Sequence, residues 1–157
     1  NATPVPDAVR KWGLAACAAI FLQILVGAVM RHAEAGLAIA RFPLASADSV
    51  LPSYWNFAVG INFAHRAGAV LVSFALLGFL GKAWANEDAR RYLRYGLLLA
   101  AGLLALQVYL GALTVWTVRN PYVATIHHLV GAFLLATTWA LTFLCHAPAR
   151  AQVESRA

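Results

Sequence analysis

The sequence predicts an all-α, polytopic membrane protein, a bundle of four transmembrane helices that forms one membrane domain over residues 1–157. Hydrophobic residues make up 62% of the chain and charged residues 11%. Soluble chains average about 45–50% apolar and about 25% charged residues. A water-soluble domain of this size has too little interior to bury so much apolar surface. Disorder is also excluded, because disordered chains combine low hydrophobicity with high charge.

Four apolar stretches are long enough to cross a bilayer, which takes about 20 mostly apolar residues in a helix. They run over about 14–30, 56–80, 95–118 and 122–145. The sequence Arg119-Asn120-Pro121 separates the last two stretches, because proline cannot continue the helix that precedes it. The longest connection, residues 31–55, joins the first two. Four consecutive spans place residues 31–55 and Arg119-Asn120-Pro121 on the same side of the membrane.

The basic residues lie in the short segments between the apolar stretches, as in membrane-protein loops. This placement argues against a nucleic-acid partner, although the net charge is +6. Eight basic residues lie on the side of the two chain ends: Arg10, Lys11, Lys82, Arg90, Arg91, Arg94, Arg150 and Arg156. Three lie on the other side: Arg31, Arg41 and Arg119. The positive-inside rule therefore predicts a protein of the cytoplasmic (inner) membrane, with both termini in the cytoplasm and residues 31–55 outside.

The outer loop over residues 31–55 is moderately apolar and contains Pro43 and Pro52. One interpretation is a flexible connector. The other is a loop whose residues around 35–44 pack over the mouth of the bundle, because so many apolar side chains would otherwise face water.

An internal repeat divides the chain into two helix pairs. The pattern LQxxxGA occurs at residues 22–28 in the first span and at 106–112 in the third. The second and fourth spans each carry histidine followed by Gly-Ala: His65 with Gly68-Ala69, and His127-His128 with Gly131-Ala132. Each pair begins and ends on the same side, so the two copies are parallel and related by an axis along the membrane normal. The glycines one turn from the histidines offer room for a flat ligand.

Histidines inside a bilayer are costly and indicate function. His65 lies seventeen residues before Lys82, about 25 Å along the helix. His127 lies nineteen residues before His146, about 28 Å along its helix, so both have a similar depth on alternate helices. Two imidazoles facing each other across a bundle suit the axial positions of a six-coordinate haem iron. The alternative is a pair of hydrogen-bonded packing residues. His127 and His128 differ by about 100° around the helix, so one of the two points inward.

Polar residues near these histidines extend the predicted site. Arg66 and Arg31, with Arg41, are candidates to pair with the haem propionates near the outer surface. Gln23 and Gln107, on the other two helices, either orient a ligand imidazole or serve as hydrogen-bonding contacts between helices.

Four segments resemble the heme A synthase family of cytochrome oxidase assembly proteins. They are LQILVGAVMRHAEAGLAIARFPL, INFAHRAGA, LQVYLGALTV and ATIHHLVGA, in this order on the four spans. Family members usually have eight spans in two four-helix halves, each with a histidine pair. In the family, one half holds a b-type haem, and the other receives heme O and oxidises its methyl group to the formyl group of heme A.

The resemblance implies that this chain is similar to one half and that His65 and His127 ligate the iron of haem b. His127 is preferred to His128 because the family's ligand lies four residues before Gly-Ala, as His127 does before Gly131. Two departures favour the haem-holding C-terminal half. Asn62 stands where the substrate-receiving half has a glutamate, and the outer loop has no cysteine.

The leading functional hypothesis is an oxidoreductase, or half of one, in heme A biosynthesis, with heme O as a possible substrate. The expected partners are membrane lipid, heme O and heme O synthase, and a second four-helix half or a second copy. The electron donor is left open. The alternatives are a bis-histidine electron-transfer cytochrome b or membrane anchor, and a non-enzymatic assembly protein.

Overall fold

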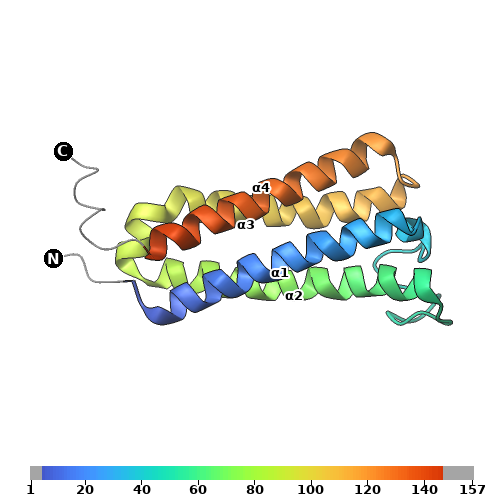
Figure 1. Cartoon of the computed structure of the whole chain (residues 1–157), viewed down its shortest axis with the longest axis horizontal. Coiled ribbons are helices and arrows are strands. Elements are labelled where there is room, and N and C mark those ends of the chain that lie inside the picture. The colour runs from blue at the N-terminus through green and yellow to red at the C-terminus, as the bar shows by residue number, and fades with distance from the viewer. Residues whose placement is uncertain (1–4, 147–157) are drawn as a thin grey trace.

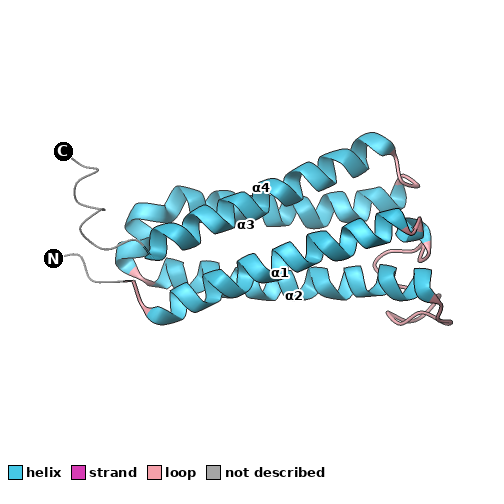
Figure 2. Ribbon diagram, in the orientation of Figure 1, coloured by secondary structure: helices cyan, strands magenta, loops and turns pink. Residues whose placement is uncertain are grey.

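The computed structural model describes residues 5–146, which form four long helices and one short 3-10 helix. The helices are α1 (Asp7–His32), η1 (Ala35–Leu37), α2 (Phe57–Ala85), α3 (Glu87–Trp116) and α4 (Pro121–His146). The long helices run alternately up and down in one bundle (Figures 1 and 2). The predicted all-α four-helix fold is therefore confirmed. Arg150 and Arg156, which contributed to the predicted orientation, lie outside the described residues.

The helices extend beyond most of the apolar stretches because polar residues cap their ends. The Asn56 side chain accepts a hydrogen bond from the Val59 amide at the start of α2 (2.9 Å), and Asn86 caps α3 in the same way through the Ala89 amide (2.8 Å). The third span was expected to reach residue 118, but α3 ends at Trp116. Val118 and Arg119 adopt left-handed backbone conformations, with φ of 52° and 60°, which a right-handed helix cannot contain.

The order of the helices around the bundle places α2 and α4 on a diagonal. The α1 helix packs chiefly against α2 and α4, and α3 packs against α4 and α2. In Figure 1, α1 begins and α4 ends at the left, which we call the terminal end. The loop between α1 and α2 and the turn between α3 and α4 lie at the right, which we call the loop end.

The apolar core fills the half of the bundle nearer the terminal end. Its members come from the beginnings of α1 and α3 and the ends of α2 and α4, and include Ile20, Leu76, Phe79, Leu97 and Leu141. Small residues allow the helices to approach there, since a Cβ added to Gly13 would lie 3.0 Å from Thr142 Cγ2 and 3.1 Å from Phe79 Cε2. Close backbone approach of this kind is how helices associate in lipid. The other half of the bundle contains the polar residues singled out in the sequence.

The outward faces of the helices suit a lipid environment. All four helices are long and apolar enough to span a bilayer. Large apolar side chains point away from the bundle, such as Phe74, which is 73% exposed, and Leu71, which is 68% exposed. A protein in water would bury these side chains, so the four helices are those of an integral membrane protein.

Candidate haem site at the loop end of the bundle

The histidines on the diagonal helices are each held by a neighbouring helix. His65 lies on α2 and His127 on α4, and both are partly buried. The glutamines of the repeated LQxxxGA pattern supply the polar contacts: Gln23 on α1 contacts His65, and Gln107 on α3 contacts His127. In each helix pair, the glutamine on the first helix thus contacts the histidine on the second helix.

His65 is fixed by two hydrogen bonds from one side chain. Gln23 Nε2 donates to the backbone oxygen of His65 (2.7 Å) and lies 3.1 Å from Nδ1 of the same residue. Gly27, one turn further along α1, seats the ring, because a Cβ added there would lie 3.0 Å from His65 Cε1. With Nδ1 occupied by Gln23, Nε2 is the imidazole nitrogen left for a ligand.

His127 is held by the equivalent residues but less tightly. Gln107 Nε2 lies 3.5 Å from His127 Nε2, at the long limit for a hydrogen bond. Gly111 again seats the ring, since a Cβ added there would lie 3.3 Å from His127 Cε1. The two helix pairs therefore use the same residue types around their histidines but contact different ring nitrogens, Nδ1 of His65 and Nε2 of His127. The nitrogen of His127 without a partner among the described residues is Nδ1.

His128 points elsewhere. Its side chain is exposed, and its Nδ1 contacts the backbone oxygen of Ala124. Counted from the Gly-Ala pair, His65 corresponds to His128, because each precedes its glycine by three residues. When the residues are matched by their contacts, His65 corresponds to His127, which contacts Gln107 and Gly111 on α3. The repeat is thus offset by one residue on α4.

The expected room beside the Gly-Ala glycines is taken by the glutamines. A Cβ on Gly68 would collide with Gln23 Oε1, and one on Gly131 would lie 3.0 Å from Gln107 Nε2. These glycines therefore make space for the glutamine side chains. The contribution of Gly27 and Gly111, which seat the histidines, was missed in the sequence, although both belong to the repeated LQxxxGA pattern.

Arg66 is part of a network, whereas Arg31 and Arg41 are exposed. The Nε atom of Arg66 donates to Asn62 Oδ1 (3.0 Å), and Nη2 donates to the backbone oxygen of Ile39 (2.7 Å). Arg31 lies in the last turn of α1, about 12 Å along the helix from Gln23. The structure therefore brings Arg66 into the network and leaves Arg31 at the rim.

Three buried side-chain polar atoms have no hydrogen-bond partner among the described residues, and all belong to the predicted site. They are Arg66 Nη1, Gln107 Oε1 and His127 Nδ1. A buried polar group without a partner costs about 1–3 kcal/mol, so such groups in a native protein need an explanation. A haem group fits these residues, because an iron ligand suits an imidazole nitrogen and a propionate suits a guanidinium N–H.

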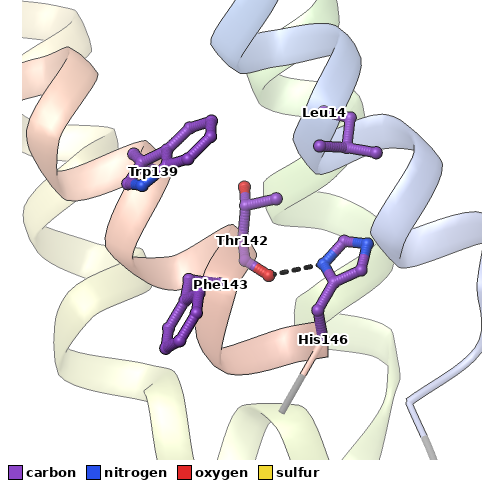
Figure 3. A pocket seen from close by; sticks show the side chains of 5 residues that line it. All are labelled: Leu14, Trp139, Thr142, Phe143 and His146. Atoms are coloured by element: carbon purple, nitrogen blue, oxygen red, sulfur yellow. Dashed lines mark hydrogen bonds between the residues drawn. The ribbon is translucent and has the colours of Figure 1, made fainter.

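A metal ion held by protein side chains alone is not supported within residues 5–146, where no cluster of three or more His, Cys, Asp or Glu side chains occurs. A groove of about 170 Å³ lies at the terminal end, between α1 and the last turns of α4 (Figure 3). It is lined by Leu14, Trp139, Thr142, Phe143 and His146. His146 contacts the backbone oxygen of Thr142 (2.8 Å). This groove is separated from His65 and His127 by the apolar core.

The fold and the apolar surface define an integral membrane protein built as a four-helix bundle with two related helix pairs. The chain belongs to the COX15-CtaA family of cytochrome oxidase assembly proteins, which it matches over residues 1–139. Its relatives include the heme A synthase of Macrococcus caseolyticus, 35% identical over 111 residues, which cover 70% of this chain and 36% of that protein. The heme A synthase of Symbiobacterium thermophilum is 34% identical over 149 residues, which cover 93% of this chain and 46% of that protein.

The heme A synthase of Bacillus pumilus is 28% identical over 136 residues, 87% of this chain and 43% of that protein. This chain therefore spans less than half the length of the relatives it matches. No solved structure matches it.

Proposed function

We propose that this chain is the haem-holding four-helix unit of a heme A synthase, with His65 and His127 as the axial ligands of one b-type haem. A haem iron with two imidazole ligands supplies one-electron redox chemistry when bound. The observation that carries the proposal is a set of three buried polar atoms, on Arg66, Gln107 and His127, that lack a partner within residues 5–146. Inside a membrane such atoms need hydrogen-bonding partners, and a bound haem supplies them.

The residues around the histidines have distinct tasks in this proposal. Gln23 orients the His65 ring through Nδ1 and directs Nε2 toward the ligand position. Gln107 contacts His127 through the other ring nitrogen, Nε2, and leaves Nδ1 for the ligand position. Gly27 and Gly111 let the rings lie close to α1 and α3. Arg66 offers its free N–H to a propionate, while the more exposed Arg31 lies near the surface from which the haem edge would be reached.

Asn62 supports the assignment to the haem-holding unit and not to the unit where heme O reacts. Both N–H groups of its amide donate to loop carbonyls, those of Ala35 (2.9 Å) and Gly36 (3.2 Å), and its oxygen accepts from Arg66. A neutral amide that is fully hydrogen-bonded cannot accept a proton at this position. The oxidation of the heme O methyl group to the formyl group of heme A then takes place in a second four-helix unit of different sequence.

The same observation favours electron transfer by a bis-histidine cytochrome as the second candidate function. The two functions separate on the product, because a heme A synthase converts heme O, supplied by heme O synthase, to heme A. A protein that only transfers electrons has the same haem absorption spectrum but forms no heme A. Co-expression with a source of heme O and with the second four-helix unit, followed by extraction and separation of the haems, distinguishes them.

The ligand assignment is tested by the absorption spectrum of the purified, reduced protein. We expect the sharp bands of a low-spin b-type haem in the unaltered chain and in His128→Ala. His65→Ala and His127→Ala each lose the haem or become high-spin, because one axial imidazole is gone. If His128→Ala loses the haem while His127→Ala keeps it, the assignment on α4 is wrong. A colourless unaltered protein refutes haem binding altogether.

The orientation in the membrane is part of the same proposal. The eight-to-three distribution of basic residues supports placing the terminal end in the cytoplasm and the haem site near the outer surface. A reporter enzyme that is active only in the cytoplasm, fused after residue 157, is expected to be active. A fusion active only outside the membrane contradicts this orientation.

A further inference from the structure

Residues 35–42 form a covering segment that is attached to α2 by two side chains one helical turn apart. Asn62 donates to the backbone oxygens of Ala35 and Gly36, and Arg66 donates to that of Ile39. The two side chains are also joined to each other, from Arg66 Nε to Asn62 Oδ1. Ala35 is 1% exposed and Ile39 is 4% exposed, so residues 35–39 pack against the bundle as the second interpretation of the loop predicted, whereas residues 40–44 are exposed.

The opposite side of the covering segment reaches the end of α3 and the turn that follows it. A Cβ added to Gly36 would lie 3.1 Å from Cδ of Arg119. The Phe42 ring meets the Trp116 ring edge to face, with centroids 6.1 Å apart. The segment therefore bridges α2 and the end of α3 at the loop end of the bundle.

Arg66 is the residue of this bridge whose bonding is incomplete. Its partners among the described residues are all neutral: the Asn62 amide, the Ile39 carbonyl and the Phe42 ring, whose centroid is 5.8 Å away. Its Nη1 atom is buried, and no residue that the structure describes is its hydrogen-bond partner. A guanidinium stays charged in proteins, so the Arg66 side chain can bind an anion through its positive charge and the N–H groups of Nη1.

The position of Arg66 identifies the kind of anion. It directly follows His65 on α2, about 14 Å along the helix from Phe57, where α2 begins. An anion at this depth arrives as part of a molecule that reaches into the bundle, and the planar fork of arginine matches a carboxylate.

Resting on the function proposed above, we infer that Arg66 recognises a porphyrin carboxylate and couples its binding to the closure of residues 35–42. A carboxylate on Nη1 completes the bonding of a guanidinium whose Nη2 already holds the Ile39 carbonyl. Charge-assisted hydrogen bonds of one group strengthen its orientation for the others. Occupation of Nη1 by a carboxylate thus reduces the opening of the covering segment.

The test compares haem b with its dimethyl ester, in which both carboxylates are blocked and the iron is unchanged. The full chain in detergent is loaded with each porphyrin, and amide hydrogen exchange is measured over residues 35–42. We expect both porphyrins to form the low-spin band. Haem b with its carboxylates unblocked should slow exchange about tenfold more than the ester, which is the lower end of the effect of one charge-assisted hydrogen bond. In Arg66→Gln the two porphyrins should protect the segment equally.

Arg66→Lys keeps the charge without the fork and should retain a smaller difference. The matched control is Arg91→Gln, which removes an exposed arginine from the terminal end and should keep the full tenfold difference. Equal protection by haem and its ester in the unaltered chain overturns the coupling, even if both bind with a low-spin spectrum. An undiminished difference in Arg66→Gln overturns the assignment to Arg66. Failure of both porphyrins to give a low-spin band refutes the proposed function and the coupling together.

Discussion

A single added methyl group at Gly27 is expected to weaken haem binding. In Gly27→Ala the new Cβ lies 3.0 Å from His65 Cε1 and 3.4 Å from Nδ1. Carbon atoms in favourable contact are about 3.5–4.0 Å apart, so the imidazole must retreat by about 0.5–1 Å. That exceeds the precision of about 0.5 Å that a ligand constellation tolerates. The Gln23 hydrogen bonds oppose the movement, because they hold the ring and the backbone of the same residue.

The magnitude follows from overpacking, which costs about 1–3 kcal/mol in a well-packed site. This corresponds to about a ten- to hundredfold weaker affinity for haem, since 1.4 kcal/mol is about a factor of ten. Gly111→Ala is the graded comparison, because its Cβ lies 3.3 Å from His127 Cε1 and that ring is held less tightly. Its effect should be smaller.

The control is Gly102→Ala, at an exposed position in the middle of α3 with no atom within 4 Å of the new Cβ. This change should leave haem affinity unaltered and stabilise the helix by about 0.5–1 kcal/mol. The assay is titration of the purified haem-free protein with haem b, followed by the low-spin band and by thermal unfolding. If Gly27→Ala binds haem as tightly as Gly102→Ala does, the seating of His65 against Gly27 does not determine ligation, and the reasoning is refuted.

Three further changes test the site and the packing that supports it. Gln23→Leu removes two hydrogen bonds to His65, whereas Gln107→Leu removes one long contact to His127. Gln23→Leu should therefore shift the reduction potential of the haem more than Gln107→Leu. Equal shifts would contradict the conclusion that His65 is held more tightly than His127. Phe79→Ala opens a cavity at a fully buried core position and should lower stability by about 3–5 kcal/mol in thermal unfolding, with the haem spectrum of the folded protein unchanged. Asn86→Ala removes the N-cap of α3 and should lower the free energy of unfolding by about 1 kcal/mol. An unchanged free energy of unfolding would show that water replaces the cap.

The sequence alone predicted the helices and their number, because long apolar runs are stable across a bilayer only as helices or closed barrels. The resemblance of four short segments to heme A synthases predicted the family. The choice of residues was also accessible: His65, His127, Gln23 and Gln107 were singled out because polar side chains are rare and costly in apolar spans. These are local properties of the chain, so one sequence is enough to predict them.

The tertiary structure decided which of these side chains meet. His127 and His128 are neighbours about 100° apart on α4, and only the position of α3 makes one of them the partner of Gln107. The family resemblance favoured His127, whereas the spacing to Gly-Ala within this chain pairs His65 with His128. The contacts of Gln107 and Gly111 are with His127.

The covering segment illustrates the same limit. Asn62 and Arg66 bind carbonyls of residues 35–39 across an irregular loop of more than twenty residues. Backbone carbonyls are alike in every residue, so no sequence pattern marks the ones that will be bonded. The composition of this chain determined that it lies in a membrane and which side chains had to be explained there. The packing of α1 on α2 and of α3 on α4 decided how those side chains are paired, because such contacts depend on distances between segments that are far apart along the chain.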